Sequence, residues 1–153
     1  MKIGVVFFHK NILNIYKKRW ILESANSILN QTFKDFSIYE INYGEDDFSL
    51  SSLVDFKDFK HIFYNTNLIN YSEAQNFILK KTIEDGCDYV FNTNLDDISY
   101  LNRFETQINY AINNKVDILS SDMEYVKEDK EVDVVTYKLE FWKYNTKEKI
   151  KEQ

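Results

Sequence analysis

Up to about residue 120, the chain alternates between two hydrophobic patterns, one typical of buried strands and the other of helices. Residues 3–8 form a continuous apolar run with β-branched and aromatic side chains, which predicts a strand buried on both faces. In residues 14–31 the apolar positions recur at helical spacing, which predicts an amphipathic helix. Residues 36–42 alternate apolar and polar side chains and predict a second strand. By the same criteria we expect strands at 61–64, 88–92 and 116–119 and helices at 73–81 and 101–114.

Strands that alternate with helices favour a mostly parallel sheet with helices on both faces, so the predicted fold class is α/β. Ligands of such sheets bind at the carboxyl ends of the strands. Ser72 is a suitable N-cap for the helix at 73–81, and Gly86 is a suitable residue to end it. Residues 47–60 are ambiguous and leave room for a short helix. Beyond the charged run that follows Glu124, residues 134–144 alternate in part and predict one strand or an antiparallel pair.

The composition of the chain excludes several classes of protein. With no proline and three isolated glycines, the sequence contains no glycine-rich phosphate-binding loop. The net charge of −6 makes nucleic acid an unfavourable partner, because that affinity depends on neutralising phosphates. A phosphate-bearing ligand would therefore need a metal ion or a local basic group. One cysteine and two histidines cannot form the usual Cys/His zinc site. No apolar run reaches the length of a transmembrane segment, and a reducing, cytoplasmic setting is expected.

The sharpest local signal for chemistry is the turn that follows the predicted strand at 88–92. It contains Asn94, Asp96 and Asp97, and two adjacent carboxylates after an apolar strand are costly unless they are exposed or liganded. Mg²⁺ and Mn²⁺ bind one or two carboxylates together with substrate phosphates, and such an ion would supply the positive charge that this acidic chain lacks. In the alternative interpretation, Asp96 or Asp97 only caps the helix that follows.

A second polar turn, residues 42–47, follows the strand predicted at 36–42. Its amide and carboxylate groups are suited to read the edge of a nucleotide base; alternatively, they form an ordinary Asx turn. Glu73 stands at the start of a predicted helix, where it complements the helix dipole or marks an anion site. His9 and His61 have no partner at a recognisable spacing, so we expect structural or exposed positions rather than catalytic roles.

Several of these segments, in order, resemble motifs of glycosyltransferase family 2. Residues 27–36 (SILNQTFKDF) resemble the family's S-I-L-x-Q-T-(Y/F)-x-(D/N)-(F/W) stretch, and residues 41–45 (INYGE) stand where the family has (V/I)-D-D-G-S. Residues 72–76 (SEAQN) are similar to (S/G)-x-A-R-N. Residues 89–97 (YVFNTNLDD) resemble Y-(I/V)-x-F-L-D-x-D-D, and residues 101–105 (LNRFE) stand where the family has P-(D/E)-(R/K)-L-E. The resemblance covers residues 2–122.

The resemblance implies a GT-A fold, in which a Rossmann-like α/β sheet binds a nucleotide sugar. It implies that Asp96 binds Mn²⁺ or Mg²⁺, which bridges the diphosphate, and that Asp97 orients the ligand or sugar. Asn94 stands at the position that contacts ribose or sugar. Asn42 or Tyr43 stands at the position that reads the base, usually uracil. The other donor-binding positions that the resemblance implies are Phe8, Asn11, Gln75 and Asn76.

The chain also departs from the pattern of this family. Asn42, Asn94 and Gln75 each stand where the family usually has a charged residue. The family's acceptor half supplies the general base that an inverting transfer needs, and we identify no such base in the short segment after Asp97. The acidic pair Glu128-Asp129 lies in a charged run, which favours a solvated loop over a catalytic site.

We therefore predict a metal-dependent glycosyltransferase that transfers a sugar from a nucleotide sugar, first of all a UDP-sugar, to an acceptor hydroxyl. Two alternatives are a catalytically degenerate GT-A module for binding or assembly and the donor-binding domain of a larger glycosyltransferase. We expect one domain over residues 1–153, with a nucleotide-sugar-binding part at 1–122 and a short extension at 123–153. The extension offers a strand that another subunit could pair with, so a homo-oligomer is a further hypothesis.

Overall fold

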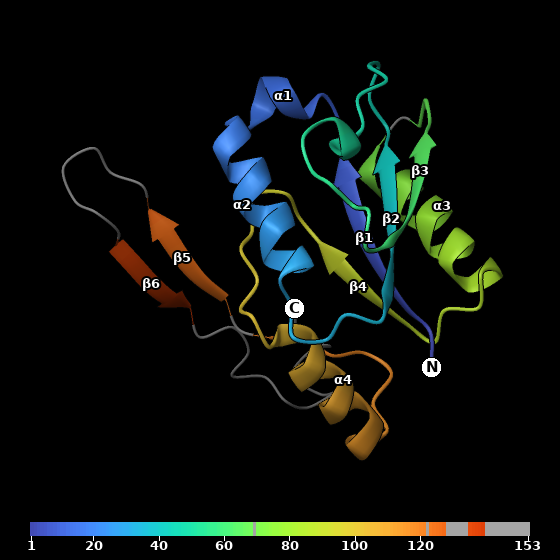
Figure 1. Cartoon of the computed structure of the whole chain (residues 1–153), viewed down its shortest axis with the longest axis vertical. Coiled ribbons are helices and arrows are strands. Elements are labelled where there is room, and N and C mark those ends of the chain that lie inside the picture. Colours follow the sequence, from blue (N-terminus) through green and yellow to red (C-terminus); the bar gives the residue numbers. More distant parts are fainter. Residues whose placement is uncertain (69, 122, 128–134, 140–153) are drawn as a thin grey trace, which may run out of the picture. The chain divides into compact units, whose positions relative to one another are not determined.

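The chain forms a four-stranded parallel sheet with helices on both faces, as the alternating patterns predict (Figure 1). The computed structural model describes residues 1–68, 70–121, 123–127 and 135–139. They belong to two compact units, Met1–Tyr110 and Ala111–Gln153. The elements follow in the order β1 (Ile3–His9), α1 (Ile12–Ile15), α2 (Lys18–Leu29), β2 (Phe36–Asn42), η1 (Leu50–Ser52), β3 (Lys60–Asn65), α3 (Tyr71–Glu84), β4 (Tyr89–Thr93), α4 (Arg103–Asn114), β5 (Met123–Lys127) and β6 (Val135–Leu139).

The strand order β3-β2-β1-β4 places β1 and β2 at the centre of the sheet. Every residue of these two strands is buried, which explains their continuous runs of apolar side chains. Across the sheet, His9 pairs with Asn42 and Phe7 pairs with Thr93. Because the strands are parallel, the polar turns that follow β1, β2 and β4 therefore lie at one edge of the sheet, where ligands of α/β sheets bind.

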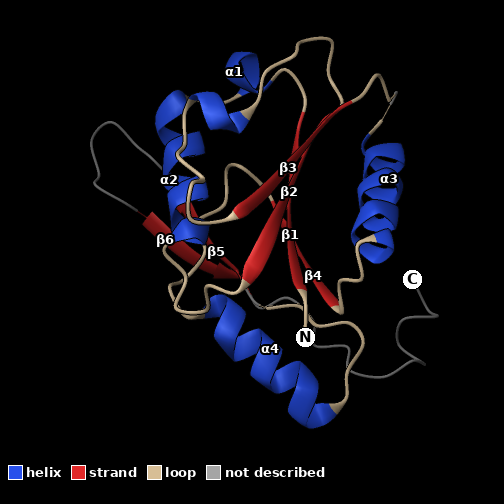
Figure 2. Ribbon diagram, turned by 45° about the vertical axis from the view of Figure 1, so that its right-hand side comes forward, coloured by secondary structure: helices blue, strands red, loops and turns tan. Residues whose placement is uncertain are grey.

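Two apolar clusters, one on each face of the sheet, hold the helices in place. Figure 2 shows α2 and α3 on opposite faces of the sheet. The cluster under α2 contains Ile21, Ala25 and Ile28 of that helix, whose spacing puts them on one helical face. The cluster under α3 contains Ala74 and Ile78. The predicted α/β architecture is thus confirmed.

The helix predicted at 14–31 is interrupted. Tyr16 and Lys17 have extended backbone conformations and separate α1 from α2. The interruption turns the Tyr16 side chain toward the carboxyl edge of the sheet, where its hydroxyl is hydrogen-bonded to Asp96. Hydrophobic spacing alone could not predict this break, because neither residue is a helix breaker by type.

The ends of α3 are set by side-chain and backbone caps. The N-cap is Asn70 rather than the predicted Ser72, because the Asn70 side chain accepts a hydrogen bond from the Glu73 N–H at 3.0 Å. Gly86, with φ of +77°, follows the helix in the left-handed conformation, so the predicted end is confirmed. The short helix allowed within residues 47–60 is the 3₁₀ turn η1.

In the second unit, residues 116–119 do not form the strand that the sequence predicts. Lys115 has a positive φ of 53°, and the Val116 N–H donates to the Ala111 carbonyl, so the chain there completes the C-terminal cap of α4. β5 and β6 form an antiparallel pair. β6 lies in the segment expected to contain a strand, whereas β5 was not predicted. Glu128 and Asp129 lie outside the described residues.

Candidate functional site

The turns after β1 and β2 are packed closely at the carboxyl edge of the sheet. The Tyr43 N–H donates to the His9 carbonyl at 3.1 Å. A Cβ at Gly44 would lie 2.8 Å from Asn11 Oδ1 and 3.0 Å from Asn11 N, so no larger residue fits there without a shift. Asn11 itself has a left-handed backbone with φ of 49°. Two of the predicted binding positions, Asn11 and Tyr43, therefore come from adjoining turns.

The predicted carboxylates lie at this same edge. Asp96 and Asp97 are both exposed, and Asn94 Nδ2 donates to Asp97 Oδ2 at 3.0 Å. Burial raises the pKa of Tyr16, and the charge of Asp96 and its hydrogen bond to the Tyr16 hydroxyl raise it further, with smaller contributions from Tyr43 and Asp97. These contributions indicate that Tyr16, Tyr43 and the two carboxylates lie near one another. Tyr16 was not predicted, because its position depends on the break between α1 and α2.

An aromatic cluster lies beside the turns after β1 and β2. The ring of Tyr71, the first residue of α3, is 5.0 Å from the ring of Phe8 and 6.5 Å from the ring of Tyr43. Burial raises the pKa of Tyr43, with a further contribution from Tyr71. Lys10 Nζ lies 5.8 Å from the centre of the Tyr43 ring and provides a local positive charge. Asn92 Nδ2 on β4 donates to the Tyr71 hydroxyl at 3.2 Å, which links the cluster to the strand that leads to Asp96.

Asn42 forms the Asx turn that the sequence left open as an alternative. The residue is fully buried, and its Nδ2 donates to both the backbone carbonyl and the side chain of Asp46, at 2.8 and 2.6 Å. Its Oδ1 accepts a hydrogen bond from the Gly44 N–H at 2.9 Å. A base contact by Asn42 would have to replace these bonds, and it stays a prediction. Tyr43, which is half-buried, is the more accessible of the two predicted base-reading residues.

The remaining predicted positions lie on α3. Gln75 follows Tyr71 by one helical turn and is half-buried, whereas Asn76 is exposed. Nothing in the structure tests their predicted contact with the donor, which remains a prediction.

The structure also contains a buried charged cluster that sequence reasoning missed. The Glu40 carboxylate lies between two histidine rings, with His9 Nε2 2.7 Å from Oε1 and His61 Nε2 2.7 Å from Oε2. The Leu50 N–H donates to Oε1 at 2.7 Å, and the Ser49 hydroxyl donates to Oε2 at 3.1 Å. The side chains of Glu40 and His9 are fully buried. The cluster fastens the loop after β2, which begins with the turn at Asn42, onto the sheet.

Two opposing effects act on the Glu40 carboxylate. Burial on its own would raise the pKa of Glu40, but the hydrogen bonds from His61, His9 and the Leu50 N–H outweigh it, so the pKa lies below its ordinary value. Within the same cluster, His9 Nδ1 is buried and has no hydrogen-bond partner among the residues that the structure describes. The signal in the sequence was a carboxylate inside a buried strand, which is stable only with buried partners.

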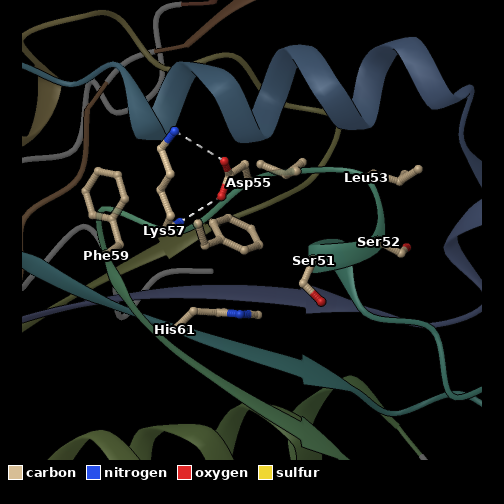
Figure 3. Close-up of a pocket in the computed structure, with 9 residues that line it drawn as sticks. Ser51, Ser52, Leu53, Asp55, Lys57, Phe59 and His61 are labelled. Carbon is tan, nitrogen blue, oxygen red and sulfur yellow. Dashed lines mark hydrogen bonds and ion pairs between the residues drawn. The ribbon is translucent and has the colours of Figure 1, made fainter.

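A pocket of about 570 Å³ lies beside η1 (Figure 3). Ser51, Phe59 and His61 contribute to its walls, and Lys57 Nζ forms an ion pair with Asp55 at 3.6 Å. His61 thus joins this pocket to the buried Glu40 carboxylate. None of the predicted donor-binding residues lines the pocket.

Comparison with known proteins shows the fold but no family. No protein-family model matches the chain, and no curated protein matches it. Matching solved structures include S. aureus TarS, with a TM-score of 0.57 and 16% identity over 82% of this chain and 21% of the TarS chain. Two structures of TarS 1–349, one of them in complex with UDP, match with TM-scores of 0.57 and identities of 17% and 18%, over 75% of this chain and 33% of theirs.

The likeness to TarS shows a Rossmann-like α/β fold, in agreement with the glycosyltransferase-like fold that the motifs imply. The chain spans between about a fifth and a third of the length of the TarS chains that it matches. Among the described residues, no helix combines the length and the apolar character needed to cross a membrane.

Proposed function

We propose that the chain is the nucleotide-sugar-binding part of a metal-dependent glycosyltransferase, with a UDP-sugar as the donor. The observation that carries this proposal is the meeting of the exposed pair Asp96 and Asp97 with Tyr16 and Tyr43 at the carboxyl edge of the sheet. The UDP in one matching TarS structure supports the choice of nucleotide.

Different side chains at this edge would bind different parts of such a donor. Tyr43 and Tyr71 offer aromatic surface for the base, since every base can stack on an aromatic ring. Lys10 lies next to Tyr43 and supplies local positive charge in a chain whose net charge is −6. The Asn94 amide already donates to Asp97, and it would accept a hydrogen bond from a ribose or sugar hydroxyl or donate one to it.

The donor set fits a hard divalent cation shared with a substrate. In the part of the chain that the structure describes, no three His, Cys, Asp or Glu side chains converge as a complete metal cage. Two exposed carboxylates are the usual contribution of a protein to Mg²⁺ or Mn²⁺ when phosphates complete the coordination. Asp96 would hold the ion, with Asp97 beside it to orient the ligand or sugar, and the bound ion would neutralise the charge of the diphosphate.

The test is calorimetric titration of UDP in the presence of Mn²⁺ and in the presence of EDTA. We expect binding with Mn²⁺, and we expect Asp96→Asn to weaken it at least about tenfold. Asp58→Asn, which neutralises an exposed carboxylate on the loop before β3, is the matched control and should bind UDP like the wild type. No binding of UDP in Mn²⁺, or equal binding by Asp96→Asn, would contradict the proposal.

A second candidate is a GT-A module that binds without catalysing transfer. The engagement of the Asn42 amide inside its own turn favours it, because this amide is not free to contact a base. Slow Mn²⁺-dependent hydrolysis of a UDP-sugar that is abolished in Asp96→Asn would decide for the enzyme. UDP binding without any hydrolysis would favour the binding module.

A further inference from the structure

Two hydroxyl side chains of α2 and an amide just after its end contact the segment between β4 and α4. Ser24 and Ser27 lie on α2 at helical spacing, and Gln31 directly follows the C-cap residue Asn30. Ser24 is 1% exposed and Gln31 is fully buried, so their polar groups need partners inside the protein. Each of them has its partner in the segment that carries Asp96 and Asp97.

The contacts fasten the loop at both ends. The Ser24 hydroxyl donates to the Asn94 carbonyl at 2.9 Å, just before the two carboxylates. After them, the Ser99 N–H donates to Ser27 Oγ at 3.0 Å. The Ser27 hydroxyl in turn donates to the Ser24 carbonyl at 2.7 Å, which orients its lone pair for Ser99.

Gln31 extends the contact toward α4. Its Nε2 donates to the carbonyls of Tyr100 and Ser27 at 2.7 and 3.0 Å, and its Oε1 accepts a hydrogen bond from the Phe104 N–H at 2.9 Å. From the side of α4, Arg103 Nη1 donates to Ser99 Oγ at 2.9 Å. Between these two fixed ends, Leu95 is buried, whereas Asp96, Asp97 and Ile98 are exposed.

We infer that Ser24, Ser27 and Gln31 are positioning residues for the Asp96–Asp97 carboxylates, an inference that rests on the proposed function. They hold the backbone on either side of the carboxylates, and so they fix where a divalent cation and its diphosphate can sit. Groups that orient metal ligands without touching the metal commonly change metal affinity by about 10–100-fold. This assigns a role to the helix motif at residues 27–36 that neither the site nor the motif itself explains.

Ser27 gives the sharpest test, because a matched residue exists on α3. The Thr82 hydroxyl also donates to the carbonyl three residues earlier, Leu79, at 2.8 Å, but α3 lies on the opposite face of the sheet from α2 (Figure 2). Ser27→Ala and Thr82→Val therefore remove the same kind of helix bond, and only the first removes the partner of the Ser99 N–H. Ser27→Thr keeps a hydroxyl and serves as the rescue variant.

Two measurements are compared in these variants, the amide exchange rate of Ser99 and the affinity for UDP in Mn²⁺ and in EDTA. We expect Ser27→Ala to speed Ser99 exchange and to weaken Mn²⁺-supported UDP binding about tenfold, with affinity in EDTA unchanged. Thr82→Val and Ser27→Thr should resemble the wild type. If folded Ser27→Ala binds like the wild type while Asp96→Asn does not, the positioning role is wrong and the proposed function stands. If the wild type itself fails to bind, both are overturned.

Discussion

Glu40 illustrates, for a single residue, what a charge inside a sheet requires. Its carboxylate accepts hydrogen bonds from two histidine rings, a backbone N–H and a hydroxyl. Isolated burial of a carboxylate is costly, and a buried pair stabilises a fold only when its remaining hydrogen-bonding capacity is also satisfied. The four donors meet this condition for Glu40, while His9 Nδ1 keeps one unsatisfied position.

The first prediction concerns Glu40→Gln. Because the folded pKa of Glu40 lies below the ordinary 4.5, its stabilising contribution is present above that pH and is lost as the pH falls through the folded pKa. At neutral pH we expect the variant to lose about 3 kcal/mol of unfolding free energy, because its amide donates where the native oxygen accepts. Below pH 4.5 the difference from the wild type should shrink.

Urea denaturation at neutral and acid pH measures this difference. Glu23→Gln is the matched control, because Glu23 is an exposed carboxylate in an ion pair with Arg19 and surface pairs contribute little. A difference between Glu40→Gln and wild type that stays constant across the acid range would show that the carboxylate charge is not what stabilises the cluster.

The second prediction contrasts two glycines. Gly44 is required by close contact with Asn11, whereas a Cβ at Gly86 would meet nothing within 4 Å and only the φ of +77° is unfavourable. Gly44→Ala should cost about 1–3 kcal/mol through overpacking, and Gly86→Ala about 1 kcal/mol through backbone strain. Asparagine tolerates the left-handed region, so Gly86→Asn should be milder than Gly86→Ala, while Gly44→Asn should be worse than Gly44→Ala. Thermal denaturation of the four variants ranks alanine against asparagine at each position. The same ranking at Gly44 and Gly86 would contradict the different roles assigned to the two glycines.

At the scale of elements, the division between α1 and α2 decides what reaches the site. Tyr16 and Lys17 are extended, and the Tyr16 hydroxyl at this break interacts with Asp96. The strands β1, β2, β3 and β4 could be predicted from the sequence, because local hydrophobic pattern determines them. The break and the Glu40 cluster could not be, because they involve residues that are distant in sequence, such as His9 and Glu40, which are 31 positions apart. The Asn70 cap is local, but Asn70 and Ser72 are both residue types that cap helices, so type alone did not distinguish them.

The third prediction tests this break with proline. Lys18 is the first residue of α2, and Lys17 before it has the extended conformation that proline prefers in its neighbour. Lys18→Pro should therefore raise the unfolding free energy by about 0.4–1 kcal/mol. In an uninterrupted helix over residues 14–31 it would instead cost about 3 kcal/mol. Asn26→Pro, in the middle of α2, should show that cost in the same denaturation experiment.

At the scale of the whole molecule, the acidic charge and the parallel sheet act together on ligand binding. The carboxyl edge gathers the candidate site, and the net charge of −6 opposes an anionic ligand that arrives without a cation. The sequence predicted Phe8, Tyr43 and Asp96 of this edge individually, but not Tyr16 or Tyr71. It did not predict which of them lie together, such as Tyr16 with Asp96 or Tyr71 with Phe8.

The fourth prediction follows from this charge balance. With Mn²⁺, UDP at one hundred times its dissociation constant should add about 2.7 kcal/mol of stability. For a chain of 153 residues this corresponds to a rise of about 5–10 °C in Tm. The same nucleotide in EDTA should leave Tm nearly unchanged. An equal rise in both conditions would show that Lys10 and its neighbours neutralise the diphosphate without a metal ion.

The arrangement around Glu40 also constrains how such sequences can diverge. Removing one partner of a buried charged cluster leaves the other groups buried without hydrogen-bond partners, which is destabilising. Exchanging all of them for apolar side chains of similar shape changes the stability little. Single replacements of His9, Glu40 or His61 should therefore be selected against, although none of the three is a predicted donor-binding residue. Related chains should keep the trio intact or have lost it as a whole, which makes its joint presence a marker of common descent that is independent of the nucleotide-binding motifs.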